Sequence, residues 1–261
     1  MISIGQFNKC SGCSACIQAC PKAAISFKKS SDGFLYPLID DKSCVNCGIC
    51  EKICPWLDSK DNPNMSDDFI AAKRKNLKKR MLSQSGGAFS VFAEKILSNR
   101  GVVYGVRFLD GKAKYCRIDK ISCLKHIRGS KYLQAEVGNI YACVAEDIIN
   151  NKKVLFSGTA CHIDGLRNYL KFKKISTDNL ITIDIICHGV VSPEMFANYK
   201  CYLEREYKGI LKSFNFRDKS YGWHGHITTF KIRIHCSFSI LLRIFPLKFI
   251  FMSSLPLIFF M

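Results

Sequence analysis

The chain has 261 residues, 48% of them hydrophobic, and a formal net charge of +18. Its length allows one small module and one larger domain. The charge alone does not indicate nucleic-acid binding, because no nucleic-acid motif accompanies it and a solvated lysine-rich helix is the commoner cause. Fifteen cysteines without an N-terminal signal peptide exclude a small secreted disulfide scaffold, and they predict a reducing, cytoplasmic compartment.

Eight of these cysteines form two copies of the pattern Cys-x2-Cys-x2-Cys-x3-Cys-Pro. The copies are Cys10, Cys13, Cys16, Cys20 and Pro21, and then Cys44, Cys47, Cys50, Cys54 and Pro55. The pattern is typical of bacterial ferredoxins, in which the fourth cysteine of each run binds the cluster of the other run. The sequence therefore predicts two 4Fe-4S clusters. The first is bound by Cys10, Cys13, Cys16 and Cys54, and the second by Cys44, Cys47, Cys50 and Cys20.

Two other uses of such cysteines fit less well. Structural zinc sites use paired cysteines rather than triplets. A disulfide framework belongs in small secreted domains. The pattern therefore favours electron transfer.

Residues 1–56 are predicted to form an α+β, ferredoxin-like module. Two short strands, 24–27 and 34–39, are joined through the turn signal Asp32-Gly33. The module has little apolar core of its own, so it is expected to depend on its clusters for folding. Residues 57–70 are polar and turn-rich, and we expect them to form a linker.

Residues 71–235 predict an α/β domain with a largely parallel sheet, because continuous apolar strands alternate with helices. The expected helices are 90–97, 139–150 and 162–170, and the expected strands are 102–108, 154–156 and 181–186. A further helix is expected to begin at Ser192-Pro193, with serine as the N-cap and proline at the first helical position.

Two of the predicted strands end near a cysteine. Cys161 follows Ser157-Gly158-Thr159-Ala160, and Cys187 directly follows Ile186. Sites in open α/β sheets lie beyond the carboxyl ends of the strands. We therefore expect Cys161 and Cys187 to face one crevice and to share a metal. A lone buried cysteine is more often a small apolar residue of the core.

Two glycine-containing segments are weaker candidates for a cofactor site. Ser83-Gln84-Ser85-Gly86-Gly87-Ala88 precedes a predicted helix, whose N-terminus can bind a phosphate or a flavin edge. Gly129-Ser130-Lys131-Tyr132 combines a cation, a hydroxyl group and a ring in one loop. A plain helix cap or turn is the commoner role of such segments.

The combination of these motifs resembles the coenzyme F420 hydrogenase/dehydrogenase beta-subunit family, and in particular bacterial members with a fused N-terminal ferredoxin domain. The resemblance depends on the order of Ser83-Gln84-Ser85-Gly86-Gly87, Gly129-Ser130-Lys131-Tyr132, Gly158-Thr159-Ala160-Cys161, Cys187-His188-Gly189 and Phe216-Arg217-Asp218-Lys219. It implies an FAD-containing oxidoreductase in which iron–sulfur clusters feed a flavin and the flavin passes a hydride to an acceptor.

The resemblance also implies partners and site residues. The donor is expected to be reduced ferredoxin or another low-potential carrier, and the acceptor a deazaflavin coenzyme or another small molecule. No nucleic-acid partner is expected. Lys131 is expected to stabilise charge at the reduced flavin or at the phosphates, as the catalytic residue. The expected FAD-binding residues are Ser85, Gly86, Gly87, Ser130, Lys131, Tyr132, Gly158 and Thr159.

The chain departs from the family pattern around its later cysteines. Ala160 and His162 flank Cys161 where the family usually has proline and glutamine, and Val191 replaces a usual proline. Family members also carry a downstream Cys-x2-Cys pair, whereas only Cys236 follows here. A third 4Fe-4S cluster with Cys161 and Cys187 is therefore expected to lack a full ligand set.

Residues 236–261 are expected to be a tail foreign to the domain, such as the product of a shifted reading frame or a truncation. The segment is almost wholly apolar, but charges and prolines, including Arg243 and Lys248, make it a poor membrane span. Membrane association is not expected apart from this tail, for which a membrane anchor is the alternative.

Two other functions compete with the flavoenzyme. The first is a ferredoxin-type electron carrier attached to a catalytically impaired domain. The second is a phosphatase, because Cys161 and Arg167 form a Cys-x5-Arg spacing. The phosphatase alternative is remote, because Asp164 and Leu166 stand where a phosphate-binding loop usually has glycines, and nucleophile motifs do not transfer between families without their context.

Overall fold

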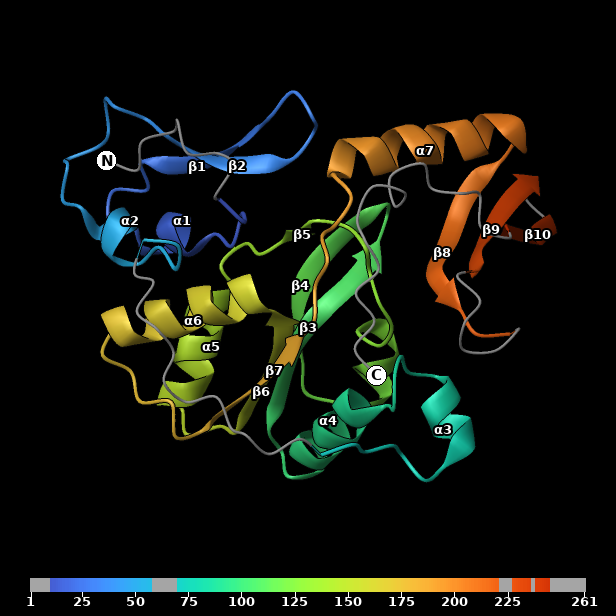
Figure 1. Cartoon of the computed structure of the whole chain (residues 1–261), viewed down its shortest axis with the longest axis horizontal. Helices are drawn as coiled ribbons and strands as arrows, with labels where there is room; N and C mark the ends of the chain where they lie inside the picture. Colours follow the sequence, from blue (N-terminus) through green and yellow to red (C-terminus); the bar gives the residue numbers. More distant parts are fainter. Residues whose placement is uncertain (1–9, 58–69, 221–226, 236–237, 245–261) are drawn as a thin grey trace. The chain divides into compact units, whose positions relative to one another are not determined.

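The computed structural model describes residues 10–57, 70–220, 227–235 and 238–244 (Figure 1). The chain divides into two compact units, Met1–Ala197 and Asn198–Met261, and the division falls within helix α7, Pro193–Glu206. The predicted linker, 57–70, lies almost wholly outside the described residues.

The N-terminal part of the first unit is a small ferredoxin-like module. Strands β1, Ile25–Lys29, and β2, Leu35–Ile39, pair antiparallel, with Ile25 opposite Ile39. Gly33 has a φ of 78°, the left-handed conformation that a tight turn requires and that glycine adopts without strain. The predicted hairpin is thus confirmed. Two short helices, α1 (Ala15–Ala19) and α2 (Ile49–Lys52), each follow a cysteine loop.

A five-stranded sheet with the order β5-β4-β3-β6-β7 forms the rest of the first unit. Its strands are β3 (Val102–Leu109), β4 (Lys112–Ile118), β5 (Ala135–Glu136), β6 (Val154–Thr159) and β7 (Leu180–Ile185). The β3–β4 hairpin is antiparallel, and the other three pairings are parallel. The predicted fold class, an α+β module followed by an α/β domain with a largely parallel sheet, is confirmed.

Helices cover both faces of this sheet (Figure 1). On one face, α5 (Ile140–Ile149) and α6 (Ala160–Phe172) pack over Tyr104, Tyr115 and Phe156. On the other face, α4 (Ala88–Ser98) and the 3-10 helix η2 (Ile121–His126) pack over Val103 and Leu155. Alternate residues of β3 and β6 thus fill two separate cores, as expected for strands buried on both sides. A short helix, α3 (Leu77–Met81), precedes α4.

Strand β7 is a predicted strand with a continuous apolar sequence, yet it is not buried on both faces. It lies at the edge of the sheet, and Ile181 and Ile185 are 45% and 50% exposed. An apolar run cannot by itself distinguish a central strand from an edge strand, because both alternate their side chains between two faces.

In the second unit, strands β8 (Ile210–Asp218), β9 (Ile227–His235) and β10 (Phe238–Ile244) form an antiparallel sheet in chain order. Leu203 of α7 packs on Phe230 and Ile232 of β9. The predicted start of α7 is confirmed, because Met195 N–H donates to Ser192 Oγ at 3.2 Å.

Strand β10 lies within residues 236–261, the segment expected to be a tail foreign to the domain. The segment has no strand period, but backbone pairing with β9 forms β10 regardless of the side-chain pattern. The remainder of the expected tail, residues 245–261, lies outside the described residues. Within the part of the chain that the structure describes, no helix is both long enough and apolar enough to cross a bilayer.

Candidate iron–sulfur and cofactor sites

The first cysteine loop curls inward through two left-handed residues. Gly12 and Ser14 both have a φ of 71°, and α1 begins directly after Ser14. This conformation turns the chain back on itself, so that Cys13 and Cys16 are both buried. Glycine adopts it freely, whereas serine does so at a cost.

Cys54 lies with the first run of cysteines. Burial is the largest of the causes that raise the pKa of Cys13 to about 12, and the neighbouring thiols of Cys161, Cys10 and Cys54 contribute to the same rise. Burial likewise raises the pKa of Cys16, with Cys13, Cys10 and Cys54 acting on it. The four thiols predicted for the first cluster therefore lie within electrostatic reach of one another, although they are far apart in sequence.

The second cysteine loop repeats this conformation at the surface. Asn46 and Gly48 have φ values of 52° and 69° at the positions of Gly12 and Ser14. A pocket in the module is lined by the four thiols predicted for the second cluster, Cys20, Cys44, Cys47 and Cys50. Cys20 comes from the end of α1 and the others from the second loop. Both groups of thiols fit 4Fe-4S clusters with crossed fourth ligands.

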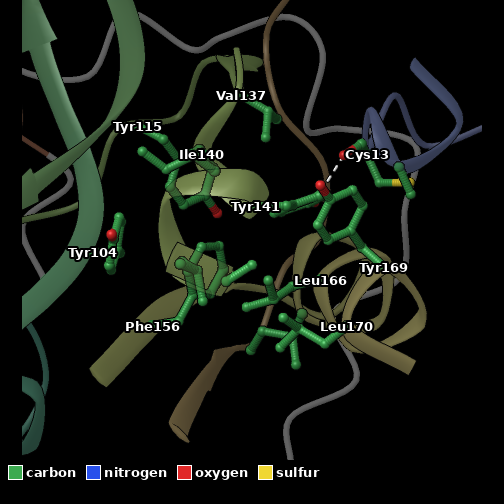
Figure 2. Close-up of a cluster of buried hydrophobic side chains, with 14 of the residues drawn as sticks. Cys13, Tyr104, Tyr115, Val137, Ile140, Tyr141, Phe156, Leu166, Tyr169 and Leu170 are labelled. Atoms are coloured by element: carbon green, nitrogen blue, oxygen red, sulfur yellow. Dashed lines mark hydrogen bonds between the residues drawn. The ribbon is translucent and has the colours of Figure 1, made fainter. Parts of the chain in front are cut away.

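Tyr141 joins the first loop to the α/β domain (Figure 2). Its buried hydroxyl group donates to the backbone oxygens of Cys13, at 2.8 Å, and of His162, at 3.1 Å. The N–H of Tyr141 donates to Gln18 Oε1 at 2.9 Å. One residue of α5 therefore contacts the cysteine loop, α1 and α6 together.

Polar contacts also fix the hairpin and the second cysteine run. The Gln134 side chain pairs with Leu35 of β2 as a neighbouring strand would, accepting from its N–H and donating to its oxygen, both at 2.8 Å. Asn168 Nδ2 of α6 donates to the oxygen of Ile53 at 3.2 Å. The module is thus held to the α/β domain by a shared buried core and by side chains of the domain that form hydrogen bonds with backbone groups of the module.

Cys161 lies beside the first cysteine run. It is in the first turn of α6, and its charge adds to burial in raising the pKa values of Cys10 and Cys13. Thr159 Oγ1 lies 3.2 Å from Cys161 Sγ and 2.9 Å from His162 Nδ1. The carboxyl end of β6 therefore faces the predicted first cluster.

Cys187 lies at the same edge of the sheet, because β6 and β7 are parallel and Thr159 is opposite Ile185. Its thiol is exposed and contacts the backbone of Gly189. Among the described residues, no three cysteine, histidine or carboxylate side chains are placed to share a single metal ion. The shared metal role of Cys161 and Cys187 stays a prediction, and Cys236 lies outside the described residues.

The glycines of the segment before α4 are required by the local packing and backbone conformation. A side chain on Gly86 would clash with the oxygen of Ala72, and Gly87 is a left-handed N-cap with a φ of 81°. Since α4 packs on β3 and leads directly into it, its N-terminus points toward the edge where β3 and β6 end. Ser85 is in this turn, also with positive φ.

Glycine at position 158 is likewise required by a neighbouring side chain of the protein. A side chain there would clash with the hydroxyl group of Tyr115, which is buried and has no hydrogen-bond partner among the described residues. Glycine at 86, 87 and 158 is therefore explained by the chain itself, and these positions alone are no evidence for a ligand.

The loop with Lys131 runs beside the segment after β7. Val191 N–H donates to the oxygen of Tyr132 at 3.1 Å, and Gln134 N–H donates to the oxygen of Val191 at 3.0 Å. Lys131 Nζ donates to the oxygens of Arg128, at 2.7 Å, and of Gly129, at 3.1 Å. Burial lowers the pKa of Lys131 to about 8.

The Cys-x5-Arg spacing does not form a phosphatase loop. Cys161 and Arg167 are both within the continuous helix α6. Only the N–H groups of the first turn are free, and those from Asp164 onward donate to carbonyl groups of the preceding turn. The segment between the two residues therefore forms no loop that could surround a phosphate. Arg167 instead donates to Thr182 Oγ1 at 3.1 Å.

Sequence reasoning missed Tyr141, Gln134 and Asn168. Each makes a contact to residues about a hundred or more positions away. A single tyrosine, glutamine or asparagine carries no local signal of such a contact. The stripe of Ile140, Val144 and Ile148 shows which face of α5 is buried, but not what packs against it.

Two family models match the chain. Residues 9–57 match the 4Fe-4S dicluster domain, and residues 151–242 match the C-terminal domain of the coenzyme F420 hydrogenase/dehydrogenase beta subunit. The second match includes the first residues of β10. No curated protein matches this sequence.

A solved chain of the F420-reducing [NiFe] hydrogenase complex from Methanosarcina barkeri is 14% identical, with a TM-score of 0.39. The similarity covers 64% of this chain and 57% of that one. It is too low to support a conclusion.

The fold, the two groups of thiols and the N-terminal match define an iron–sulfur electron-transfer protein with two 4Fe-4S clusters. The C-terminal match then confirms the family resemblance. The chain combines a 4Fe-4S dicluster domain with the C-terminal domain of coenzyme F420 hydrogenase/dehydrogenase beta subunits.

Proposed function

We propose that this chain is a flavin-dependent oxidoreductase that relays electrons from a low-potential, ferredoxin-like donor through two 4Fe-4S clusters to FAD. The acceptor is a small molecule such as a deazaflavin coenzyme. The ligands of the clusters are the two crossed sets of four cysteines, and residues 71–235 hold the flavin.

The position of Cys161 carries this proposal. Its thiol lies with Cys10 and Cys13 and, through Thr159, at the carboxyl end of β6. Ligands of open α/β sheets bind at this edge. A cofactor there would lie next to the first cluster, as electron transfer between the two requires.

Several residues around this edge would hold the flavin. Ser130 and Thr159 offer hydroxyl groups, Tyr132 offers a half-exposed ring, and the N-terminus of α4 after Ser85 attracts anionic groups. Lys131 offers a cation for phosphate groups or for a reduced, anionic ring. FAD, when bound, supplies the change between one-electron and two-electron transfer. Glycines 86, 87 and 158 shape the surrounding backbone.

The test is the flavin content of the full chain after anaerobic reconstitution with iron, sulfide and FAD. We expect about eight irons per chain, from two cubanes, together with bound FAD that becomes reduced after the clusters. Lys131→Gln should weaken FAD binding and Lys131→Arg should preserve it. Since the pKa of Lys131 is about 8, its charge is present below that pH and is lost as the pH rises through 8. FAD affinity of the unsubstituted chain should fall over that range, but not in Lys131→Arg.

A chain with about eight irons and no FAD would instead support the electron-carrier alternative. Substituting Gly87 does not decide the question, because its positive φ makes any side chain there destabilising without a ligand. Cys161 and Cys187 remain candidate ligands of a third, incomplete cluster. If they hold one, the unsubstituted chain should contain more than about eight irons, and Cys161→Ala should lower the content to about eight.

A further inference from the structure

The two cysteine loops differ in exposure although their spacing is identical. In the first loop, Cys13 and Cys16 are buried. In the second loop, Cys47 is exposed and the neighbouring Val45 is 56% exposed. The pocket formed by the second group of thiols includes Val45 in its lining. A carrier protein can therefore approach the second group at Cys47. In the first group no thiol is exposed, because Cys10 and Cys54 are half-buried and Cys13 and Cys16 are buried.

The contacts to the α/β domain show the opposite distribution. Tyr141 bonds to Cys13, and a side chain on Gly165 of α6 would lie 3.3 Å from Cys13 Sγ. Cys161 acts electrostatically on Cys10 and Cys13. For the second run, the contact to α6 is Asn168 with Ile53, which precedes Cys54, itself a predicted ligand of the first cluster. These contacts reach the first cluster's ligands or their neighbours, whereas Cys20 and Cys50 of the second group are half-buried at the margin of the shared core.

We infer that the two clusters work in a fixed order: an external one-electron donor protein reduces the second cluster, at the surface, and the first cluster alone exchanges electrons with the α/β domain. In each step the donor loses one electron and the second cluster gains one, which then passes to the first cluster. Tyr141 positions the first loop against α6. This order rests on the proposed electron-relay function, but it does not require that the final cofactor be FAD.

The order can be tested by stopped-flow absorbance at the clusters, with a reduced bacterial-type ferredoxin as the donor and dithionite as a small reductant that needs no docking surface. In Cys20→Ala/Cys50→Ala, which lacks the second cluster, reduction by ferredoxin should slow roughly tenfold or more, within the range over which association rates vary among variants of one interface. Reduction by dithionite should remain. In Cys16→Ala/Cys54→Ala, the second cluster should be reduced at the unsubstituted rate.

A milder pair of variants tests the same order if the cysteine variants fail to fold. Val45→Glu places a charge beside the second cluster while leaving every cysteine in place. Ile121→Glu makes the same change at a 49% exposed position of η2, on the other side of the sheet from α5 and α6. Val45→Glu should slow reduction by ferredoxin but not by dithionite, and Ile121→Glu should slow neither.

Unchanged ferredoxin reduction in the variant lacking the second cluster would overturn the proposed order. So would equal slowing by Val45→Glu and Ile121→Glu, or a dimer of the unsubstituted chain that Val45→Glu dissociates, since the exposed loop would then be a self-association surface. Cluster absorbance is read without FAD, so a chain that binds no flavin would contradict the proposed function and leave this test intact.

Discussion

The loops 10–16 and 44–50 share one cysteine spacing and one backbone conformation, but they lie in different surroundings. Each passes twice through positive φ, at Gly12 and Ser14 in the first loop and at Asn46 and Gly48 in the second. The first is enclosed by α5 and α6, and the second lines a pocket at the surface of the module. The spacing sets which metal centre can bind. The surroundings set which centre can meet a partner.

The largest expected effect comes from removing equivalent ligands of the two loops. Cys16→Ala and Cys50→Ala should each lower the iron content to roughly half, because each removes one cubane of two. Cys16 belongs to the core shared with α5 and α6, whereas Cys50 only packs against its margin. Cys16→Ala should therefore also destabilise the α/β domain by several kcal/mol. Anaerobic thermal unfolding followed by circular dichroism measures this difference. If the two variants lose equal stability, the first cluster stabilises only the ferredoxin-like module and not the α/β domain.

A smaller effect is expected at the joint between the first loop and α5. Tyr141→Phe removes the hydroxyl group that bonds to Cys13 and His162, and should cost about 1–3 kcal/mol because it leaves buried groups without that partner. It should also shift the midpoint potential of the first cluster, since hydrogen bonds to the ligand residues of a metal centre influence its reduction potential.

Tyr104→Phe is the matched control. Tyr104 is a buried tyrosine of the same core, and its hydroxyl group donates to Asp147 at 2.5 Å. Its loss should also reduce stability but should leave both cluster potentials unchanged in a redox titration followed by electron paramagnetic resonance. If Tyr104→Phe moves the same potential by the same amount, the effect of Tyr141 is one of general core stability.

The smallest effect is expected from exchanging equivalent residues of the two loops. Ser14→Gly should stabilise the protein by about 1 kcal/mol, because serine pays a steric cost in the left-handed region that glycine avoids. Gly48→Ser should destabilise it by about the same amount, since its surroundings are open and only the backbone cost applies. Both are measured by anaerobic unfolding.

A different outcome at Ser14 would be informative. Its hydroxyl group is buried without a protein partner among the described residues. If Ser14→Gly fails to stabilise the protein and instead lowers the potential of the first cluster, the hydroxyl group donates to the cluster and the two loops differ in chemistry as well as in exposure.

The sequence alone predicted the elements whose cause is local. The hairpin follows from Asp32-Gly33, and the start of α7 follows from Ser192-Pro193. The cysteine spacing predicted which thiols should be grouped, and the structure places Cys54 with the first run and Cys20 with the second.

Features that depend on distant residues could not be predicted in this way. The apolar sequence of β7 does not reveal that it is an edge strand, and β10 forms by pairing with β9. Gly158 resembled a ligand-binding glycine, yet Tyr115, on another strand, already requires it. The enclosure of one loop and the exposure of the other likewise arise from α5 and α6, which lie far from both loops in sequence.

The most direct test of the difference between the two loops is the accessibility of each cluster to a soluble paramagnetic chelate. Cys20→Ala/Cys50→Ala retains the first cluster, and Cys16→Ala/Cys54→Ala retains the second. The spin relaxation of the reduced cluster is measured in each variant as the chelate is added. We predict strong enhancement of relaxation for the second cluster and little for the first. Equal enhancement would contradict the assignment of one enclosed and one surface cluster, and with it the proposed order of electron transfer.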